Sequence, residues 1–98
     1  MTVHVAVFRW KEGVDVQKQN AVLDEALDRM AAQIPGLVSF ERGGDLGLYR
    51  RSFDYALVAH FDGPEALKAY KGNGVHEAVF QTHIAPVLGQ QGSVQFEV

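Results

Sequence analysis

Two side chains suited to proton-transfer chemistry, the phenol of Tyr70 and the imidazole of His76, stand six positions apart in the chain. A neutral imidazole can take a proton from an acidic C–H group near neutral pH. A tyrosine hydroxyl can donate a hydrogen bond to a carbonyl oxygen on which negative charge develops. Between them lies the turn Gly72-Asn73-Gly74, whose glycines allow the backbone to bring both side chains to one place. The pair therefore indicates a site that holds a small molecule or moves its protons. The alternative is a histidine that tethers a loop beside a packed tyrosine.

The other three histidines do not extend this pair into a metal site. His4 shares the helix-facing side of a predicted strand with Ala6, whereas His60 is predicted on the opposite sheet face, and His83 follows two helical turns after His76. No two histidines have the i, i+4 spacing of a zinc-binding helix, and the chain has no cysteine. We therefore expect neither a bound metal nor another cofactor.

The size and composition of the chain indicate one small domain over residues 1–98. Hydrophobic residues make up 47% of the chain, more than a core of this size hides, which favours an oligomer. A net charge of -3 without a basic block argues against binding to nucleic acid or to an anionic membrane. No apolar run is long enough to span a bilayer and no signal peptide is recognisable, so we expect a cytoplasmic protein.

Residue patterns predict four strands. β-Branched and aromatic residues concentrate over residues 3–10, 37–42, 53–61 and 92–98. An apolar stripe at helical spacing, from Leu23 to Ile34, predicts a helix that begins after the N-cap Asp15 and ends before Pro35-Gly36.

Two further helices are predicted in the second half of the chain. The segment Asp62-Gly63-Pro64-Glu65 starts a helix that stops at Gly72, and another helix covers about residues 75–87, ended or kinked by Pro86. The resulting order is strand, helix, strand, strand, helix, strand. It predicts an α+β, ferredoxin-like βαββαβ domain with a four-stranded antiparallel sheet.

The first strand is mostly apolar on both faces, with Val3, Val5 and Val7 on one of them. A single layer of helices covers one face of a sheet, and the other face then needs a partner. We therefore expect a homodimer through the sheet faces, closing two sheets into a dimeric α/β barrel.

Five segments occur in the order and at the offsets found in one known family. They are His4-Val5-Ala6-Val7-Phe8, Pro35-Gly36-Leu37, Asp54-Tyr55-Ala56-Leu57-Val58, Phe61-Asp62-Gly63-Pro64-Glu65-Ala66-Leu67, and Ala69-Tyr70 followed by Val75-His76. Over residues 3–98 the sequence resembles the stress-responsive A/B barrel (Dabb) family.

The resemblance implies a dimeric barrel with a mostly apolar pocket for a carbonyl-bearing small molecule, between each sheet and its own helices. One branch, the olivetolic acid cyclase-like polyketide cyclases, closes poly-β-keto thioesters by aldol condensation without a cofactor. Its catalytic residues correspond to His76, as general base, and Tyr70, as hydrogen-bond donor. We expect the remaining pocket lining to comprise His4, Ala6, Phe8, Leu27, Leu57, Val79 and Phe80.

Two other functions stay open at this stage. The first is a non-catalytic, stress-related or ligand-binding dimer. The second is a cofactor-free or haem-using monooxygenase, because dimeric barrels of that related group share the topology.

Overall fold

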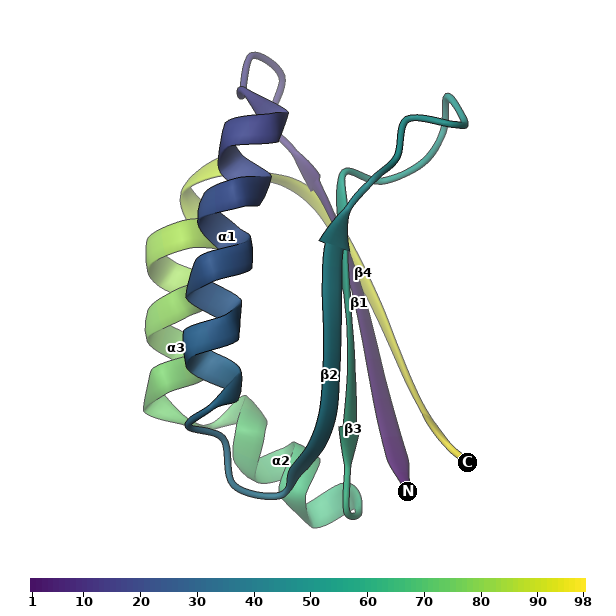
Figure 1. Ribbon diagram of the computed structural model, residues 1–98, viewed down its shortest axis with the longest axis vertical. Helices are drawn as coiled ribbons and strands as arrows, with labels where there is room; N and C mark the ends of the chain where they lie inside the picture. The colour runs from purple at the N-terminus through teal and green to yellow at the C-terminus, as the bar shows by residue number, and fades with distance from the viewer.

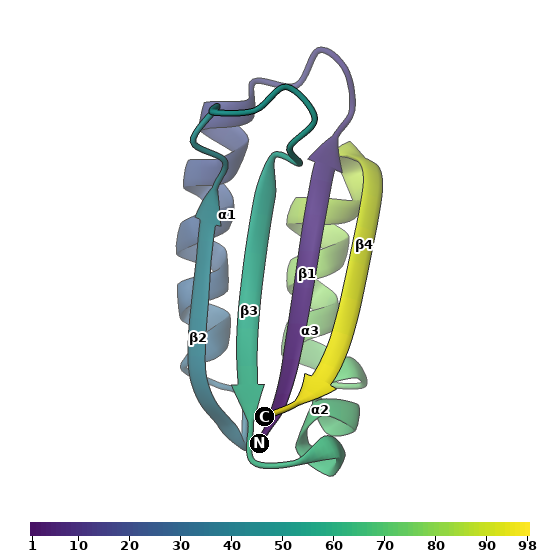
Figure 2. The same ribbon diagram turned by 90° about the vertical axis from the view of Figure 1, so that its right-hand side faces the viewer.

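The computed structural model describes residues 1–98 as one layer of helices on a four-stranded sheet (Figures 1 and 2). Figure 1 shows all helices on the same side of the sheet, with both chain termini at one end. In chain order the elements are β1 (Thr2–Trp10), α1 (Val16–Ala31), β2 (Leu37–Gly44), β3 (Tyr55–Phe61), α2 (Pro64–Lys71), α3 (Gly74–Val79), the π-helical turn η1 (Phe80–Ile84), the 3-10 turn η2 (Ala85–Val87) and β4 (Leu88–Glu97).

The sheet has the strand order β2-β3-β1-β4, and every neighbouring pair is antiparallel, as Figure 2 shows face on. This arrangement confirms the predicted ferredoxin-like fold. In the register of the sheet, Ala6 of β1 lies opposite Leu57 of β3 and Ser93 of β4. Because β1 is central, its helix-facing residues are enclosed by strands on both sides.

Helix α1 begins as predicted, since the side chain of Asp15 accepts a hydrogen bond from the backbone N–H of Lys18. The helix ends at Ala31, a few residues before Gly36, which has a positive φ of 78°. Its apolar stripe packs on the sheet and forms one core with residues from the strands and from the other helical segments. The most deeply buried side chains of this core are Leu23, Leu27, Met30, Ala59, Phe61 and Tyr55.

The predicted single helix over residues 75–87 is instead three consecutive helical segments, α3, η1 and η2. Pro86 lacks a backbone N–H and its ring conflicts with the carbonyl four residues earlier, so a regular helix cannot continue through it. The chain widens into a π-helical turn before Pro86 and then tightens. The side-chain amide of Gln19 donates to the backbone carbonyl of His83 across 2.7 Å, which satisfies a group exposed by this irregularity.

Three strand ends also differ from the prediction by two residues or more. β2 continues through Gly44 and β4 begins at Leu88, because their backbones find partners on β3 and β1, respectively. Pairing with a neighbouring strand extends a strand beyond its β-rich residues. β3 begins at Tyr55 rather than at Phe53.

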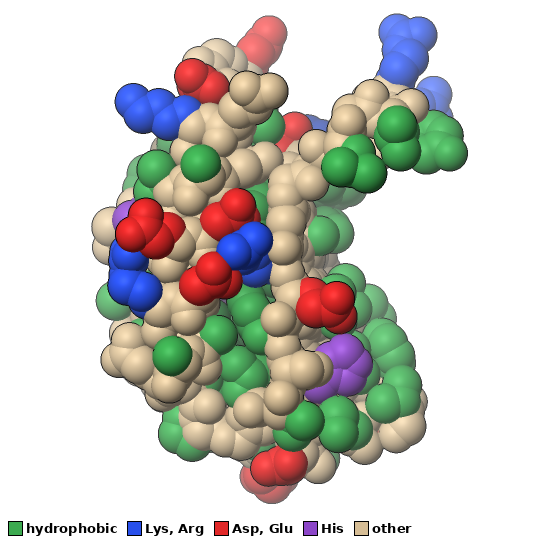
Figure 3. Space-filling view, in the orientation of Figure 1, with side chains coloured by type: hydrophobic (Ala, Val, Ile, Leu, Met, Phe, Trp, Pro, Cys, Tyr) green, Lys and Arg blue, Asp and Glu red, His purple; other side chains and the backbone are tan.

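The sheet face remote from the helices carries apolar side chains that nothing in the chain covers. Val94 and Phe96 of β4 are 55% and 45% exposed. The loop between β2 and β3 projects over this face, and Figure 3 shows hydrophobic side chains along the hollowed surface beneath it. Leu46, Leu48 and Tyr49 of this loop are exposed as well. No helix combines the length and the hydropathy that crossing a membrane requires.

Candidate functional site

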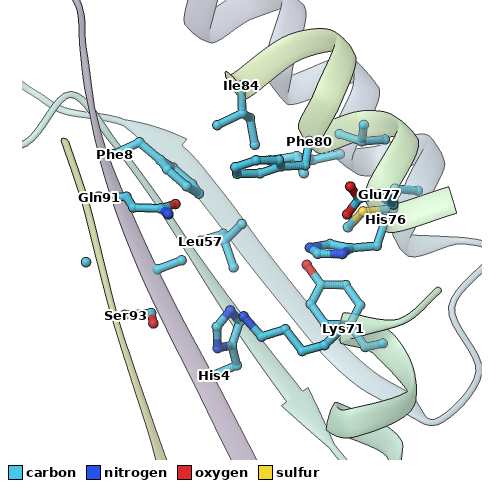
Figure 4. Close-up of a pocket in the computed structure, with 16 residues that line it drawn as sticks. His4, Phe8, Leu57, Lys71, His76, Glu77, Phe80, Ile84, Gln91 and Ser93 are labelled. Carbon is cyan, nitrogen blue, oxygen red and sulfur yellow. The ribbon is translucent and has the colours of Figure 1, made fainter. Parts of the chain in front are cut away.

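A cavity of about 430 Å³ lies between the sheet and its helices, within the size range of small-molecule sites. Strands β1, β3 and β4 supply one wall, and helices α1, α2, α3 and the turn η1 supply the other (Figure 4). Every site residue expected from the sequence borders this one space. These residues are His4, Ala6, Phe8, Leu27, Leu57, Tyr70, His76, Val79 and Phe80.

Tyr70 and His76 are in direct contact in the cavity wall. The centroids of their rings are 4.2 Å apart and the ring planes are inclined at 49°. Tyr70 is only 3% exposed and also packs against Phe61, with ring centroids 5.3 Å apart. No hydrogen bond joins Tyr70 to His76, and the Tyr70 hydroxyl bonds to no other group of the protein. The hydroxyl therefore remains available to a ligand.

Two helix ends fix this contact. Tyr70 lies in the last turn of α2, which stops at Gly72, and His76 lies in the first turn of α3. The side chain of Asn73 caps α3 by accepting a hydrogen bond from the backbone N–H of Val75 across 2.8 Å. Because the linker between the helices is this short, the capped turn sets how the two rings meet.

His76 reaches into the cavity from the helical wall (Figure 4). Its Nδ1 atom is buried and has no hydrogen-bond partner. A charged imidazole needs partners for both ring N–H groups, so the orphaned Nδ1 disfavours the protonated form. The neutral form of the His76 ring is therefore favoured.

His4 is 3% exposed and lies beside Tyr70, with ring centroids 6.1 Å apart. The side-chain amide nitrogen of Gln95 lies 2.9 Å from Nδ1 of His4. An amide N–H₂ group only donates, so Nδ1 accepts and the ring proton is assigned to Nε2. His4 thereby offers an N–H donor at the same end of the cavity as the Tyr70 hydroxyl.

Burial shifts all three titratable rings toward their neutral forms. The pKa of His4 falls from its ordinary 6.5 to about 4, chiefly through loss of hydration and further through the nearby Lys71 and His76. Burial also lowers the pKa of His76, with help from Lys71 and against the opposing effect of Glu77. Burial raises the pKa of the Tyr70 hydroxyl to about 12. Near neutral pH the site holds two neutral imidazoles and a protonated phenol.

Several cavity residues were missed at the sequence level. Lys71 and Glu77 directly follow Tyr70 and His76, so their positions offered a signal. Gln91 was overlooked because the last strand was predicted to begin at Gly92. Ser93 lay inside that predicted strand, and its alternation with Val94 offered a signal that was not used. The others, Met30, Ile84 and Gly92, depend on how the helices and β4 pack against the sheet.

The remaining histidines lie outside the cavity. His83 is half-buried and does not border it. His60 pairs with Val3 on the sheet face away from the helices, and its Nδ1 is buried without a partner. No group of three or more His, Asp or Glu side chains is arranged to hold a metal ion.

Comparisons with known proteins agree with this architecture. The family model described as the stress responsive A/B barrel domain, Dabb, matches residues 2–98. A dimeric ferredoxin-like protein of unknown function from Thermobifida fusca is 36% identical and superimposes with a TM-score of 0.89, the match covering 99% of this chain and 90% of that one.

Two more distant structures show the same fold. A dimeric protein of unknown function from Bacteroides fragilis is 22% identical, with a TM-score of 0.85 over 99% of this chain and 95% of that one. A hydroxynitrile lyase from Passiflora edulis is 15% identical, with a TM-score of 0.82 over 99% and 92% of the two chains. No curated protein matches the sequence.

Proposed function

The chain belongs to the stress responsive A/B barrel domain family, and from this premise we propose that its cavity binds a carbonyl-bearing small molecule and moves a proton on it without a cofactor. The reaction class is that of polyketide cyclases, with His76 as general base and Tyr70 as hydrogen-bond donor. One observation carries the proposal, namely the contact of these two rings at 4.2 Å in the wall of a cavity of about 430 Å³.

The proposed chemistry starts at a methylene group between two carbonyls, the most acidic C–H group of a poly-keto chain. The neutral imidazole of His76 takes one proton from this carbon, and the electron pair moves onto the adjacent carbonyl oxygen. The hydroxyl of Tyr70 donates a hydrogen bond to that oxygen, where negative charge develops. The carbon then forms a bond to a second carbonyl carbon, and the new alkoxide takes the proton back from His76. No electrons enter or leave, so this sequence needs no redox partner.

The ionisation states support these two roles. A base must be unprotonated before it acts, and burial lowers the pKa of His76. A hydrogen-bond donor must keep its proton, and burial raises the pKa of Tyr70 to about 12. Both shifts have the same cause, loss of hydration inside the cavity.

The shape of the cavity supports a ligand with an apolar part. Phe8, Leu27, Leu57 and Phe80 line it together with Ile84. The polar groups of Lys71 and His76 lie with His4 and Tyr70, whereas Gln91 lies beside Phe8. The hydroxynitrile lyase from Passiflora edulis shows that a protein of this fold can be a lyase, but at 15% identity the likeness concerns the fold alone.

We further propose that the protein works as a homodimer through the open sheet face. Val94 and Phe96 give this face an apolar surface, and the loop that carries Leu48 overhangs it. Similar proteins from Thermobifida fusca and Bacteroides fragilis are described as dimeric. Covering this face would bury apolar area in both copies.

Deuterium exchange tests the proposed chemistry without the natural ligand. Benzoylacetamide has a methylene group between two carbonyls, and proton NMR in heavy water follows the loss of its signal. We expect the protein to accelerate exchange above the rate in buffer, and His76→Gln to remove the acceleration. His83→Gln is the matched control, because His83 does not border the cavity. Exchange that is unaffected by His76→Gln, in a variant that stays folded, would refute His76 as the base and favour a non-catalytic dimer.

A further inference from the structure

The cavity has a cation that no group of the protein neutralises. Lys71 is the last residue of α2 and borders the cavity next to Tyr70. Its ammonium group forms no ion pair and no hydrogen bond within the chain. By contrast, Lys68 on the same helix pairs with Glu65 across 3.3 Å. Lys71 is therefore free to bind a ligand.

The direction of its side chain also favours this role. Figure 4 shows Lys71 extended along the cavity toward His4 rather than outward from α2. Its charge contributes to the lowered pKa of both His4 and His76, so the ammonium group acts on both imidazoles. A ligand group bound by Lys71 would consequently lie next to the Tyr70 and His76 pair.

Only one acidic side chain, Glu77, borders the cavity. Its Oε1 atom accepts a hydrogen bond from the side-chain amide of Gln81 at 3.1 Å, and Figure 4 shows it on the helical wall above His76. It makes no ion pair with Lys71. Since His4 and His76 are neutral near pH 7, Lys71 is the cationic group at its end of the cavity.

Two polar side chains line the cavity wall opposite the helices. Gln91 and Ser93 of β4 border the cavity, and both are labelled across from the helices in Figure 4. The side-chain amide of Gln91 makes no hydrogen bond within the chain, apart from its backbone pairing. In the sheet register Gln91 lies opposite Phe8, whereas Ser93 lies opposite Ala6, two residues from His4. An oxygen-rich ligand head beside Lys71 could therefore be bound by a cation together with the neutral donors of Tyr70 and His4, and Ser93 is the nearer of the two β4 side chains.

We propose that Lys71 binds the carboxylate of the ligand, so that the cavity selects oxo carboxylates with an apolar tail. The carboxylate pairs with the ammonium group, the keto oxygen meets Tyr70 and His4, and the tail lies against Phe8 and Phe80. This inference rests on the proposed function, because it assigns the ligand class of the same cavity.

A carboxylate at Lys71 would also change the basicity of His76. Lys71 is one of the groups that lower the pKa of His76. A carboxylate bound to Lys71 offsets that positive charge, and the pKa of His76 rises toward the neutral range in which a general base is most effective. Binding of the anionic group thus strengthens the base beside it.

Isothermal titration calorimetry can test Lys71 with two probes that differ in charge. Benzoylacetate is a β-keto carboxylate, and benzoylacetamide is its uncharged analogue. We expect the wild-type protein to bind benzoylacetate roughly tenfold more tightly, as a charge-assisted hydrogen bond allows. Lys71→Met should bring the affinities for the two probes to within about twofold of each other, and Lys71→Arg should retain the preference. Lys68→Met is the matched control, because it removes a lysine of the same helix that does not border the cavity.

The outcomes separate this inference from the proposed function. Equal affinity of the wild-type protein for both probes, or a preference that survives Lys71→Met, overturns the role of Lys71. The exchange of benzoylacetamide protons is followed in the wild-type protein and in variants of His76 and Tyr70, all of which keep Lys71, so it remains a separate test of those two residues. If the wild-type protein binds neither probe and accelerates no exchange, both the ligand class and the proposed function are refuted.

Discussion

The rings of Tyr70 and His76 lie 4.2 Å apart between centroids, yet no hydrogen bond connects them. A phenol and an imidazole so close would normally satisfy each other when buried. Here the hydroxyl of Tyr70 has no partner in the chain, and Nδ1 of His76 is buried without one. The buried, unpartnered Nδ1 of His76 is costly to folding, and the unpaired hydroxyl of Tyr70 is open to a ligand, so this pair is the natural target for substitution.

Tyr70→Phe should separate catalysis from stability. The hydroxyl makes no hydrogen bond within the chain and is not among the fully buried polar atoms, so its removal should change the free energy of unfolding by less than about 0.5 kcal/mol. Loss of one donor to a developing oxyanion should slow the exchange of benzoylacetamide protons roughly a hundredfold. NMR exchange rates and urea denaturation measure the two effects.

Tyr55→Phe is the matched control for Tyr70→Phe. The Tyr55 hydroxyl donates to Oδ1 of Asp24 at 2.5 Å and lies outside the cavity. We expect this variant to lose about 1 kcal/mol of stability and to keep its exchange rate. If Tyr55→Phe slowed the exchange and Tyr70→Phe did not, the role of Tyr70 as hydrogen-bond donor would be contradicted.

His76→Leu should leave the protein as stable as the wild type or raise its free energy of unfolding by about 1 kcal/mol. The leucine removes a buried ring nitrogen that has no partner and places an apolar side chain against an apolar wall. Thermal and urea unfolding at a fixed protein concentration measure the change. A melting temperature several degrees lower would show that His76 belongs to the structure of the loop.

The stability of the protein should fall on mild acidification because of His4. Its pKa is about 4 in the folded protein and 6.5 when unperturbed, so the unfolded state binds more protons between these values. The contribution of His4 to the free energy of unfolding is therefore fully present above about pH 6.5. It is lost as the pH falls toward about 4, which lowers the free energy of unfolding by at most about 3 kcal/mol. The lowered pKa of His76 acts in the same direction.

Urea denaturation across this pH window tests the effect of His4. In His4→Gln the decline should be shallower than in the wild-type protein, whereas His83→Gln should retain the full decline. The carboxyl of Asp28, whose pKa lies below 3.8, contributes only in more acidic solution. An equal decline in His4→Gln and wild type would show that another group is responsible.

Phe96→Asp should break the homodimer. Phe96 is 45% exposed on the open sheet face, and a charge there would be buried against the partner. Light scattering after size exclusion reports the mass. Val22→Asp is the matched control, since Val22 is 43% exposed on α1, on the helical side of the sheet. A Phe96→Asp protein that stays folded and dimeric would place the interface elsewhere.

Gly36→Ala should destabilise the fold by about 2 kcal/mol. Gly36 has a φ of 78°, and a Cβ atom built there would lie 2.7 Å from Cβ of Ala66. Gly63→Ala is the matched control, because its backbone is extended and a Cβ atom would meet nothing within 4 Å. Urea denaturation of both variants should show the loss only at Gly36.

The sequence alone determined the order of the elements and the fold class. Local signals sufficed at the cap Asp15, at the turn Pro35-Gly36 and along the alternating β3, because each of them depends on neighbours in the chain. The nine expected site residues also came to one cavity, since strand alternation and helical spacing set which way each side chain points. Whether these residues bind and transform a ligand stays a prediction.

Only the tertiary structure decided the features that depend on partners distant in sequence. The π-helical turn Phe80–Ile84 and the early start of β4 follow from packing near Pro86 and from pairing with β1, which no local pattern encodes. The unpaired ammonium of Lys71 could be recognised only in the structure, where Glu77 accepts a hydrogen bond from Gln81 and makes no ion pair with Lys71. Long-range contacts settle which polar groups are satisfied, and the groups left unsatisfied define the candidate site.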